Sequence, residues 1–528
     1  MVQPERLQFF TFGKDDPLTS ISNSNESTQA DYLLCYLDDL GASTVIEEPN
    51  YFDRDYLAEF AAFYSVSSRG YANICRRLHF FSNEINRTQL RSAAGGSDRQ
   101  NKILQDSYLG FIIIRPIPAA PLGRTVLTWY PEQEENKHTP RMRNPSRDYK
   151  VHVAGIELTV NGLAWQQQDT GVGACATVSL WSMLHSSAFD DHHAIPTTAD
   201  ITRDAHSKHS FGSRVFPSQG LNFYQICDAI KEQKLAPLIT EGDIKSEKSG
   251  KVLGFSRERF LSTCAAYIRS GYPILLSGNL MATGSSGHAI CVVGFRSCVP
   301  STTDPNSPSL AESGIEYIYI HDDNLGPNVR FKVDTVSLEK EVAVLSADAP
   351  EPVNKSRTLA CPTKNYPEFI PTQIIVAAHN DIRTDPDKLH RAGLRNATYI
   401  SKILNLIADK NSQPRFGLTV STRFIKLATY LGDELSDRLG DNPKVLSSVR
   451  LALCEKVDPM SLHIGVVRIG LDDSTPLVDI IYDTTDSDRN HPIFCYVAYS
   501  DKIPDVMDII ESIHSIGLGP YKTSVKAY

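Results

Sequence analysis

The sequence predicts a mixed α+β protein built from several domains. The chain has 528 residues, which is too long for one hydrophobic core, so two to four domains are expected. Short apolar runs typical of buried strands alternate with segments whose apolar residues recur at helical spacing. Hydrophobic residues make up 41% of the chain and charged residues 22%, as in ordinary globular proteins.

Composition also excludes several classes of protein. The net charge of −9 disfavours binding to nucleic acid or to an anionic membrane, so neither partner is expected. The amino terminus lacks a basic start followed by an apolar core, which argues against a secretory signal. The longest apolar runs, such as residues 110–114, are too short to span a bilayer. Ten cysteines without C-x-x-C spacing are typical of reduced thiols, which indicates the cytoplasm.

Residues 1–150 predict an N-terminal α/β domain, to which the sequence assigns no role. Its expected elements are a helix at 31–41, a strand at 44–48, a helix at 56–64 and a buried strand at 108–116. Residues 132–150 are polar, with acidic residues followed by basic ones. They predict a solvated linker, with a basic contact for an acidic partner as the alternative.

Residues 151–349 form the second expected domain. Helices are predicted at 175–187, 222–234 and 257–270, followed by strands at 273–277, 288–295 and 315–321. A Ser-, Thr- and Pro-rich surface loop is expected at 296–313.

Residues 350–528 predict a C-terminal α+β domain, with a role in substrate recognition or regulation. A linker is expected at 350–367, then a strand at 373–378 and helices at 399–408 and 433–453. Strands at 463–471, 478–483 and 494–499 and a helix at 505–514 complete it.

Cys175 is the first candidate for chemistry, because it begins an apolar helix directly after Gly171 and Gly173. A helix N-terminus carries partial positive charge and stabilises a thiolate, which is the nucleophilic form of cysteine. The glycines would let the chain turn sharply and bring backbone N–H groups toward a substrate carbonyl. The amide of Gln167 or Gln168 could donate to the same oxyanion. Taken alone, a cysteine in a helix is more often a small buried hydrophobic residue.

A histidine and an acidic turn follow on two later strands. His288 opens an apolar strand next to Gly287, where it has a rigid mount and room for a substrate. The strand at 315–321 runs into Asp322, Asp323 and Asn324. By alternation Asp322 shares a face with the buried isoleucines, so Asp322 is expected to orient His288, with Asp323 and Asn324 as alternatives. The other interpretation of these three residues is ordinary turn chemistry.

Together these segments resemble papain-like cysteine peptidases, and in particular the branch that processes bacteriocins at double-glycine leaders. The resemblance covers the middle third of the chain. It is carried by Gln167 and Gln168 before Gly-Ala-Cys175, by residues 217–226 with Ala-Pro-Leu at 236–238, by 271–276, by 287–295, and by His321-Asp322.

The resemblance implies a papain-like domain flanked by the N-terminal and C-terminal domains. Cys175 would be the nucleophile, His288 would hold it as a thiolate, and Asp322 would fix the imidazole tautomer. Gln168 or Gln167 would stabilise the oxyanion together with the Cys175 backbone N–H. The implied function is an intracellular cysteine protease that acts on a protein or peptide through a thioester, with no cofactor and no metal.

Three further expectations remain open. Analogy alone suggests a partner protein that activates the site. Analogy also suggests that the protein is a processing enzyme or toxin-like effector in a bacterial conflict system. The same triad would serve a deamidase or a transglutaminase. A papain fold can also be a non-catalytic binding or scaffold module.

Two other sequence patterns resemble binding motifs, but we interpret neither of them as a binding site. Residues 171–176 match a dinucleotide fingerprint, but no strand precedes them as that motif requires. The His-rich stretch with Asp190, Asp191, His192, His193, His206 and His209 predicts a solvated loop rather than a metal site.

Overall fold

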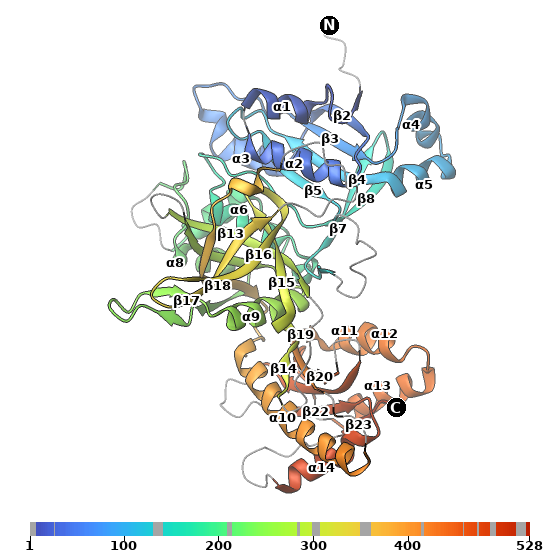
Figure 1. The fold of residues 1–528 in the computed structure, drawn as a ribbon. Helices are drawn as coiled ribbons and strands as arrows, with labels where there is room; N and C mark the ends of the chain where they lie inside the picture. The colour runs from blue at the N-terminus through green and yellow to red at the C-terminus, as the bar shows by residue number, and fades with distance from the viewer. Residues whose placement is uncertain are drawn as a thin grey trace. The chain divides into compact units, whose positions relative to one another are not determined.

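The structure, a computed structural model, is a mixed α+β protein, as the sequence predicts. It describes residues 7–25, 27–129, 141–208, 214–281, 286–297, 307–348, 361–412, 415, 417–457, 459–471, 475–485, 493–513 and 524–528. The chain divides into two compact units, whose elements are labelled in Figure 1. Unit 1 comprises Met1–Ser256, Gly271–Arg296 and Tyr317–Ala377, and unit 2 comprises Arg257–Ser270, Ser297–Glu316 and Ala378–Tyr528.

Unit 1 begins with a five-stranded antiparallel sheet, drawn in blue to cyan in Figure 1. Its strands lie in chain order: β1 (Gln8–Thr11), β2 (Thr44–Tyr51), β3 (Cys75–Phe81), β4 (Tyr108–Ile114) and β5 (Leu122–Leu127). The connecting helices are α1 (Pro17–Asn25), α2 (Thr28–Asp39), α3 (Arg54–Ala62), α4 (Arg87–Ala94) and α5 (Asp98–Ser107). Every residue of β4 is buried. Gly110 has a φ of +125°, and a Cβ there would lie 2.1 Å from the carbonyl oxygen of Val126, so only glycine fits.

A hairpin and three helices follow the first sheet. They are β7 (Arg147–Val153), β8 (Ile156–Gly162), α6 (Cys175–Leu184), α7 (Thr198–Ala205) and α8 (Phe223–Glu232). Short strands β10 (Ile244–Lys245) and β11 (Val252–Gly254) pair with each other.

The second large sheet of unit 1 closes on itself, because β12 pairs with β13 on one side and with β18 on the other. The strands between them run in the order β13, β15, β16, β17 and β18, while β9 extends the sheet beyond β18 and β6 pairs with β13. The bounds are β6 (Arg141–Met142), β9 (Ala236–Glu241), β12 (Ile274–Leu280), β13 (Ser286–Ser297), β15 (Ile315–Asp322), β16 (Gly326–Ser337), β17 (Glu341–Asp348) and β18 (Phe369–Ala378).

Closure of this sheet depends on Gly278. Gly278 of β12 lies opposite His288 of β13, and a Cβ on Gly278 would lie 2.2 Å from the carbonyl oxygen of Ile370 on β18. Glycine therefore lets β18 approach β12 directly beside His288.

Unit 2 is built on a six-stranded sheet in the order β14, β19, β20, β21, β22 and β23. The strands are β14 (Ser309–Leu310), β19 (Thr419–Lys426), β20 (His463–Gly470), β21 (Pro476–Asp483), β22 (Ile493–Ala498) and β23 (Ser524–Lys526). The helices are α9 (Arg257–Arg269), α10 (Pro386–Lys410), α11 (Leu427–Thr429), α12 (Leu435–Leu439), α13 (Pro443–Glu455) and α14 (Lys502–Ile513). Val449 and Leu453 of α13 pack with Ile464 and Val466 of β20 in its core.

The two units differ from the expected division at residues 150 and 350. Residues 1–150 share unit 1 with the residues that follow them, so the division into two units does not fall at residue 150. Strand β18 was assigned to the C-terminal domain by position, yet its residues pair with β12 in unit 1. Helix α9 lies inside the expected middle domain but belongs to unit 2.

Several elements differ in length from the sequence-based expectation. The helix expected at 433–453 is interrupted, since Asn442 caps a new helix whose first residue is Pro443. Helix α10 begins at Pro386, well before the expected start at 399. Residues 147–150, expected in a linker, belong to β7. The rest of the expected linkers and of the 296–313 loop lies partly outside the described residues, at 130–140, 298–306 and 349–360. Within the described ranges, no helix combines the length and apolar character needed to cross a bilayer.

Candidate active site

Helix α6 presents Cys175 at its first position. The nine residues that follow Cys175 in α6 are all buried, whereas Cys175 itself is partly exposed. Ser179, one turn further on, donates a hydrogen bond of 2.9 Å to the carbonyl oxygen of Ala289 on β13. This bond ties helix α6 to the strand residue that follows His288.

His288 lies between Cys175 and Asp322. Its Nε2 is 3.1 Å from Oδ1 of Asp322, and its ring also shares a hydrogen bond with the Cys175 side chain. Because Nε2 faces Asp322, Nδ1 is the ring nitrogen left for the thiol. Burial lowers the pKa of His288, but the Asp322 carboxylate and the thiol contact outweigh burial, so that the pKa lies well above its ordinary value. The structure thus brings the three predicted residues together in the predicted order.

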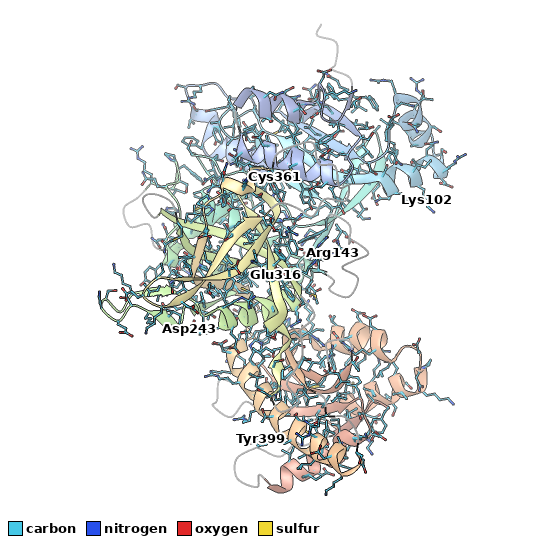
Figure 2. The ribbon with its side chains drawn as sticks, in the orientation of Figure 1. Lys102, Arg143, Asp243, Glu316, Cys361 and Tyr399 are labelled. Carbon is cyan, nitrogen blue, oxygen red and sulfur yellow. The ribbon has the colours of Figure 1, made fainter. Side chains whose placement is uncertain are left out.

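Asp322 is held by hydrogen bonds on every side. Its Oδ1 also accepts from the backbone N–H of Asn324 at 2.9 Å, and its Oδ2 accepts from the Tyr366 hydroxyl at 2.6 Å. Its carbonyl oxygen accepts from Nε1 of Trp165 at 2.9 Å. Sequence reasoning missed Tyr366 and Trp165, because both are far from Asp322 in the chain. Tyr366 follows a 3-10 turn (Pro362–Asn365) that packs against α2, next to Cys361 in Figure 2.

The two alternative residues of the acidic turn take different positions. Asp323 is 2% exposed and lies 3.7 Å from Nε2 of His288, and neither of its carboxyl oxygens accepts a hydrogen bond from another described residue. Burial, only partly offset by His288, raises the pKa of Asp323 to about 7. Nδ2 of Asn324 is 3.4 Å from Nε2 of His288. Asp322 is therefore the closest partner of His288, as alternation predicts.

The two glutamines point in different directions. Nε2 of Gln168 donates a hydrogen bond of 2.7 Å to Oδ1 of Asn324, so Gln168 reaches the group around His288. Gln167 is buried, and its side-chain oxygen accepts from the backbone N–H of Leu122 at 3.3 Å. Of the two oxyanion candidates, the structure brings Gln168 and not Gln167 to the His288 group.

The glycine loop before Cys175 is closed by Asp169. Oδ1 of Asp169 accepts from the backbone N–H groups of Gly171, Val172 and Gly173 at 2.6, 2.6 and 3.2 Å. Asp169 therefore engages these three N–H groups, so they do not face a substrate carbonyl, whereas the expected role of the Cys175 backbone N–H stays a prediction. An aspartate two residues before a glycine is a local turn signal that sequence reasoning could have used.

A cavity of about 600 Å³ opens beside Cys175 and His288. Apart from His288, its described lining is uncharged and comes from the residues before and within α8 and from strands β12, β13 and β18. The lining residues are Cys175, Ala176, Gln219, Gly220, Leu221, Asn222, Phe223, Gln225, Ile226, Ser277, Gly287, His288, Ala289, Gln373 and Ile375. The cavity thus suits a neutral group that meets apolar side chains together with amide and hydroxyl groups.

His288, Asp322 and Asp323 are also placed so that one ligand atom of each lies within 4.8 Å of the others. They form the one such group found in the described ranges, and sequence reasoning did not predict it. However, both oxygens of Asp322 already accept hydrogen bonds from protein donors. In the His-rich stretch, His193 and His206 face the backbone carbonyls of Leu184 and Thr202, and His209 lies outside the described residues.

No protein-family model matches the chain, and no curated protein matches it. The geometry of the site therefore has to carry any functional conclusion.

Proposed function

We propose that the chain is a cysteine peptidase-like hydrolase that cleaves a protein or peptide through a thioester on Cys175. The observation that carries the proposal is the position of His288, which contacts the Cys175 thiol and the buried Asp322 carboxylate at the edge of an open cavity. A nucleophile, a base and a residue that orients the base are the parts that acyl transfer requires.

The proposed reaction begins with transfer of the Cys175 proton to Nδ1 of His288. The thiolate sulfur attacks the substrate carbonyl carbon, and the oxyanion is held by the Cys175 backbone N–H and the Gln168 amide. The C–N bond breaks as His288 returns its proton to the leaving amine. Water then attacks the thioester while His288 takes its proton, the C–S bond breaks, and the thiol is restored. An amine in place of water would give a transglutaminase by the same steps.

A cytoplasmic location remains part of this proposal. It is supported by the cysteines, because all nine that the structure describes are free thiols. A reducing compartment would keep Cys175 available for chemistry.

The test of the proposal is the rate at which iodoacetamide alkylates Cys175 as a function of pH, followed by peptide mass spectrometry. Near pH 6 we expect Cys175 to react about tenfold faster than Cys454, the exposed thiol that serves as internal reference, because only Cys175 has an imidazolium partner. His288→Ala should abolish this advantage. Equal rates for the two thiols in the wild type, or no effect of His288→Ala, would overturn the proposal.

The lining of the cavity predicts a preference for peptides with a neutral apolar residue. Phe223→Ala removes the largest apolar side chain from the lining and should raise KM by about tenfold for such a peptide, which corresponds to roughly 1.4 kcal/mol of binding. The alkylation rate of Cys175 by the small reagent should not change. Phe52→Ala is the matched control, since Phe52 is 60% exposed and does not line the cavity. Equal KM values for the two variants would contradict the proposed contact between the substrate and Phe223.

A further inference from the structure

The loop that precedes Cys175 is anchored by a buried ion pair from the first sheet and its helices. Asp169 closes this loop with Oδ1, and its Oδ2 lies 3.4 Å from Nη1 of Arg115. Arg115 directly follows β4 and is 2% exposed. The same Nη1 donates to Oε2 of Glu59 on α3 at 3.0 Å. The charge that sets the loop therefore comes from residues more than fifty positions upstream.

Arg115 and Glu59 also bind two residues of the segment before Cys175, and Glu59 binds one residue of α7. Nη2 of Arg115 donates to the carbonyl oxygen of Gln167 at 2.9 Å. Oε1 of Glu59 accepts from Nε2 of Gln166 at 3.0 Å and from the Thr198 hydroxyl of α7 at 2.7 Å. Glu59 is fully buried, and among the described residues Arg115, Gln166 and Thr198 compensate its charge. Removing one partner of such a pair is strongly destabilising, because it leaves the other charge buried without compensation.

Helix α2 makes comparable contacts with the acidic turn on the other side of the site. Nε2 of Gln29 donates to the carbonyl oxygen of Asp323 at 3.1 Å. The ring of Tyr32 lies against Gly326, where a Cβ would be 2.1 Å away. The Tyr36 hydroxyl accepts from Nδ2 of Asn328 at 3.2 Å. The turn that carries Asp322 thus packs directly on α2.

We propose that residues 7–129 position both halves of the site. In this proposal Arg115, Glu59 and Asp169 set the loop that delivers Cys175, and α2 sets the turn that delivers Asp322. None of these residues touches the cavity, so they are positioning residues. Their role in catalysis rests on the proposed function, whereas their effect on the conformation of the loop does not. The inference gives a role to the segment that lies outside the resemblance to papain-like peptidases.

Asp169→Asn is the principal test, because the amide keeps an oxygen for the loop N–H groups but loses the charge that pairs with Arg115. Hydrogen exchange in the peptide that contains residues 171–173 should become about tenfold faster, because weaker acceptors open local structure more often. Near pH 6 alkylation of Cys175 should also slow by about tenfold, because the thiol is no longer held in contact with His288. Asp479→Asn is the matched control. It removes a buried carboxylate that pairs with Arg468 in unit 2 at 2.7 and 2.8 Å, and it should leave both readouts unchanged.

A second variant keeps the proposal testable if the Asp169→Asn protein does not fold. Gln29 is only partly buried, so Gln29→Ala should fold, while hydrogen exchange around residues 322–325 should accelerate. Faster exchange in either segment supports the proposal, and wild-type exchange in both folded variants overturns it. If wild-type Cys175 shows no enhanced reactivity, the proposed function fails, yet the exchange measurements still decide whether residues 7–129 hold the loop and the turn.

Discussion

Asp322→Ala is expected to slow the alkylation of Cys175 near pH 6 by about a hundredfold. His288 is 6% exposed, and its charged form depends on the Asp322 carboxylate. Without that carboxylate the effect of burial prevails, the pKa of His288 falls, and the neutral imidazole no longer provides a cation for the thiolate. The rate should be measured by peptide mass spectrometry across the pH range in which the wild type reacts.

Two further variants make this result specific. Asp322→Asn retains an oxygen that accepts from His288 but lacks the charge, so its rate should lie between the wild type and Asp322→Ala. Asp323 lies 3.7 Å from Nε2 of His288. Besides burial, the Asp322 charge raises the pKa of Asp323, so loss of that charge would favour the negatively charged form of Asp323. Combining Asp322→Ala with Asp323→Asn should therefore slow the reaction further. An Asp322→Ala protein that folds and reacts like the wild type would contradict the role assigned to Asp322.

Asp323→Asn is expected to stabilise the protein, and to do so increasingly as pH rises. Burial raises the pKa of Asp323 to about 7, above its ordinary value of 3.8, so the folded state binds the proton more tightly than the unfolded state. The resulting penalty is absent below the unfolded pKa, grows as pH rises between the two values, and is complete above about pH 7. The substitution should remove a cost on the order of 4 kcal/mol at pH 8.

Thermal unfolding at pH 5 and pH 8 measures this difference. The gain in Tm from Asp323→Asn should be larger at pH 8 than at pH 5. Asp322→Asn is the control, because Asp322 accepts three hydrogen bonds and its replacement should destabilise the protein at both pH values. A gain of equal size at both pH values would show that the Asp323 carboxyl is not the titrating group.

Local patterns, taken together, were sufficient to select the three residues that the structure brings together in the candidate site. Cys175 follows from a glycine-rich turn before an apolar helix, and His288 follows from the start of an apolar strand. Asp322 was preferred over Asp323 by alternation along a strand, and the structure places its oxygen closest to His288. In each case the relevant information lies within a few residues of the side chain, where backbone periodicity decides which way it points.

The partners that support these residues could not be predicted in the same way. Arg115 and Glu59 are separated by 56 positions, and Gln29 and Asp323 by 294. A buried arginine and a buried glutamate have the same local sequence signature as exposed ones, and only the tertiary fold decides which of them meet. Strand β18 was misplaced for the same reason, since pairing with β12 is a property of the closed sheet and not of the strand itself.

The path of the chain between the two units has a consequence for how the protein can be divided. The backbone passes from one unit to the other after Ser256, Ser270, Arg296, Glu316 and Ala377. A fragment that ends at residue 350 would lose β18 and leave the second sheet open, and one that begins at 378 would lack α9 and β14. Neither unit is therefore one continuous segment of the sequence, so a single exchange of sequence cannot move either unit into another protein. A truncation, a fusion junction or a protease cut in this chain can therefore separate segments that belong to the same unit.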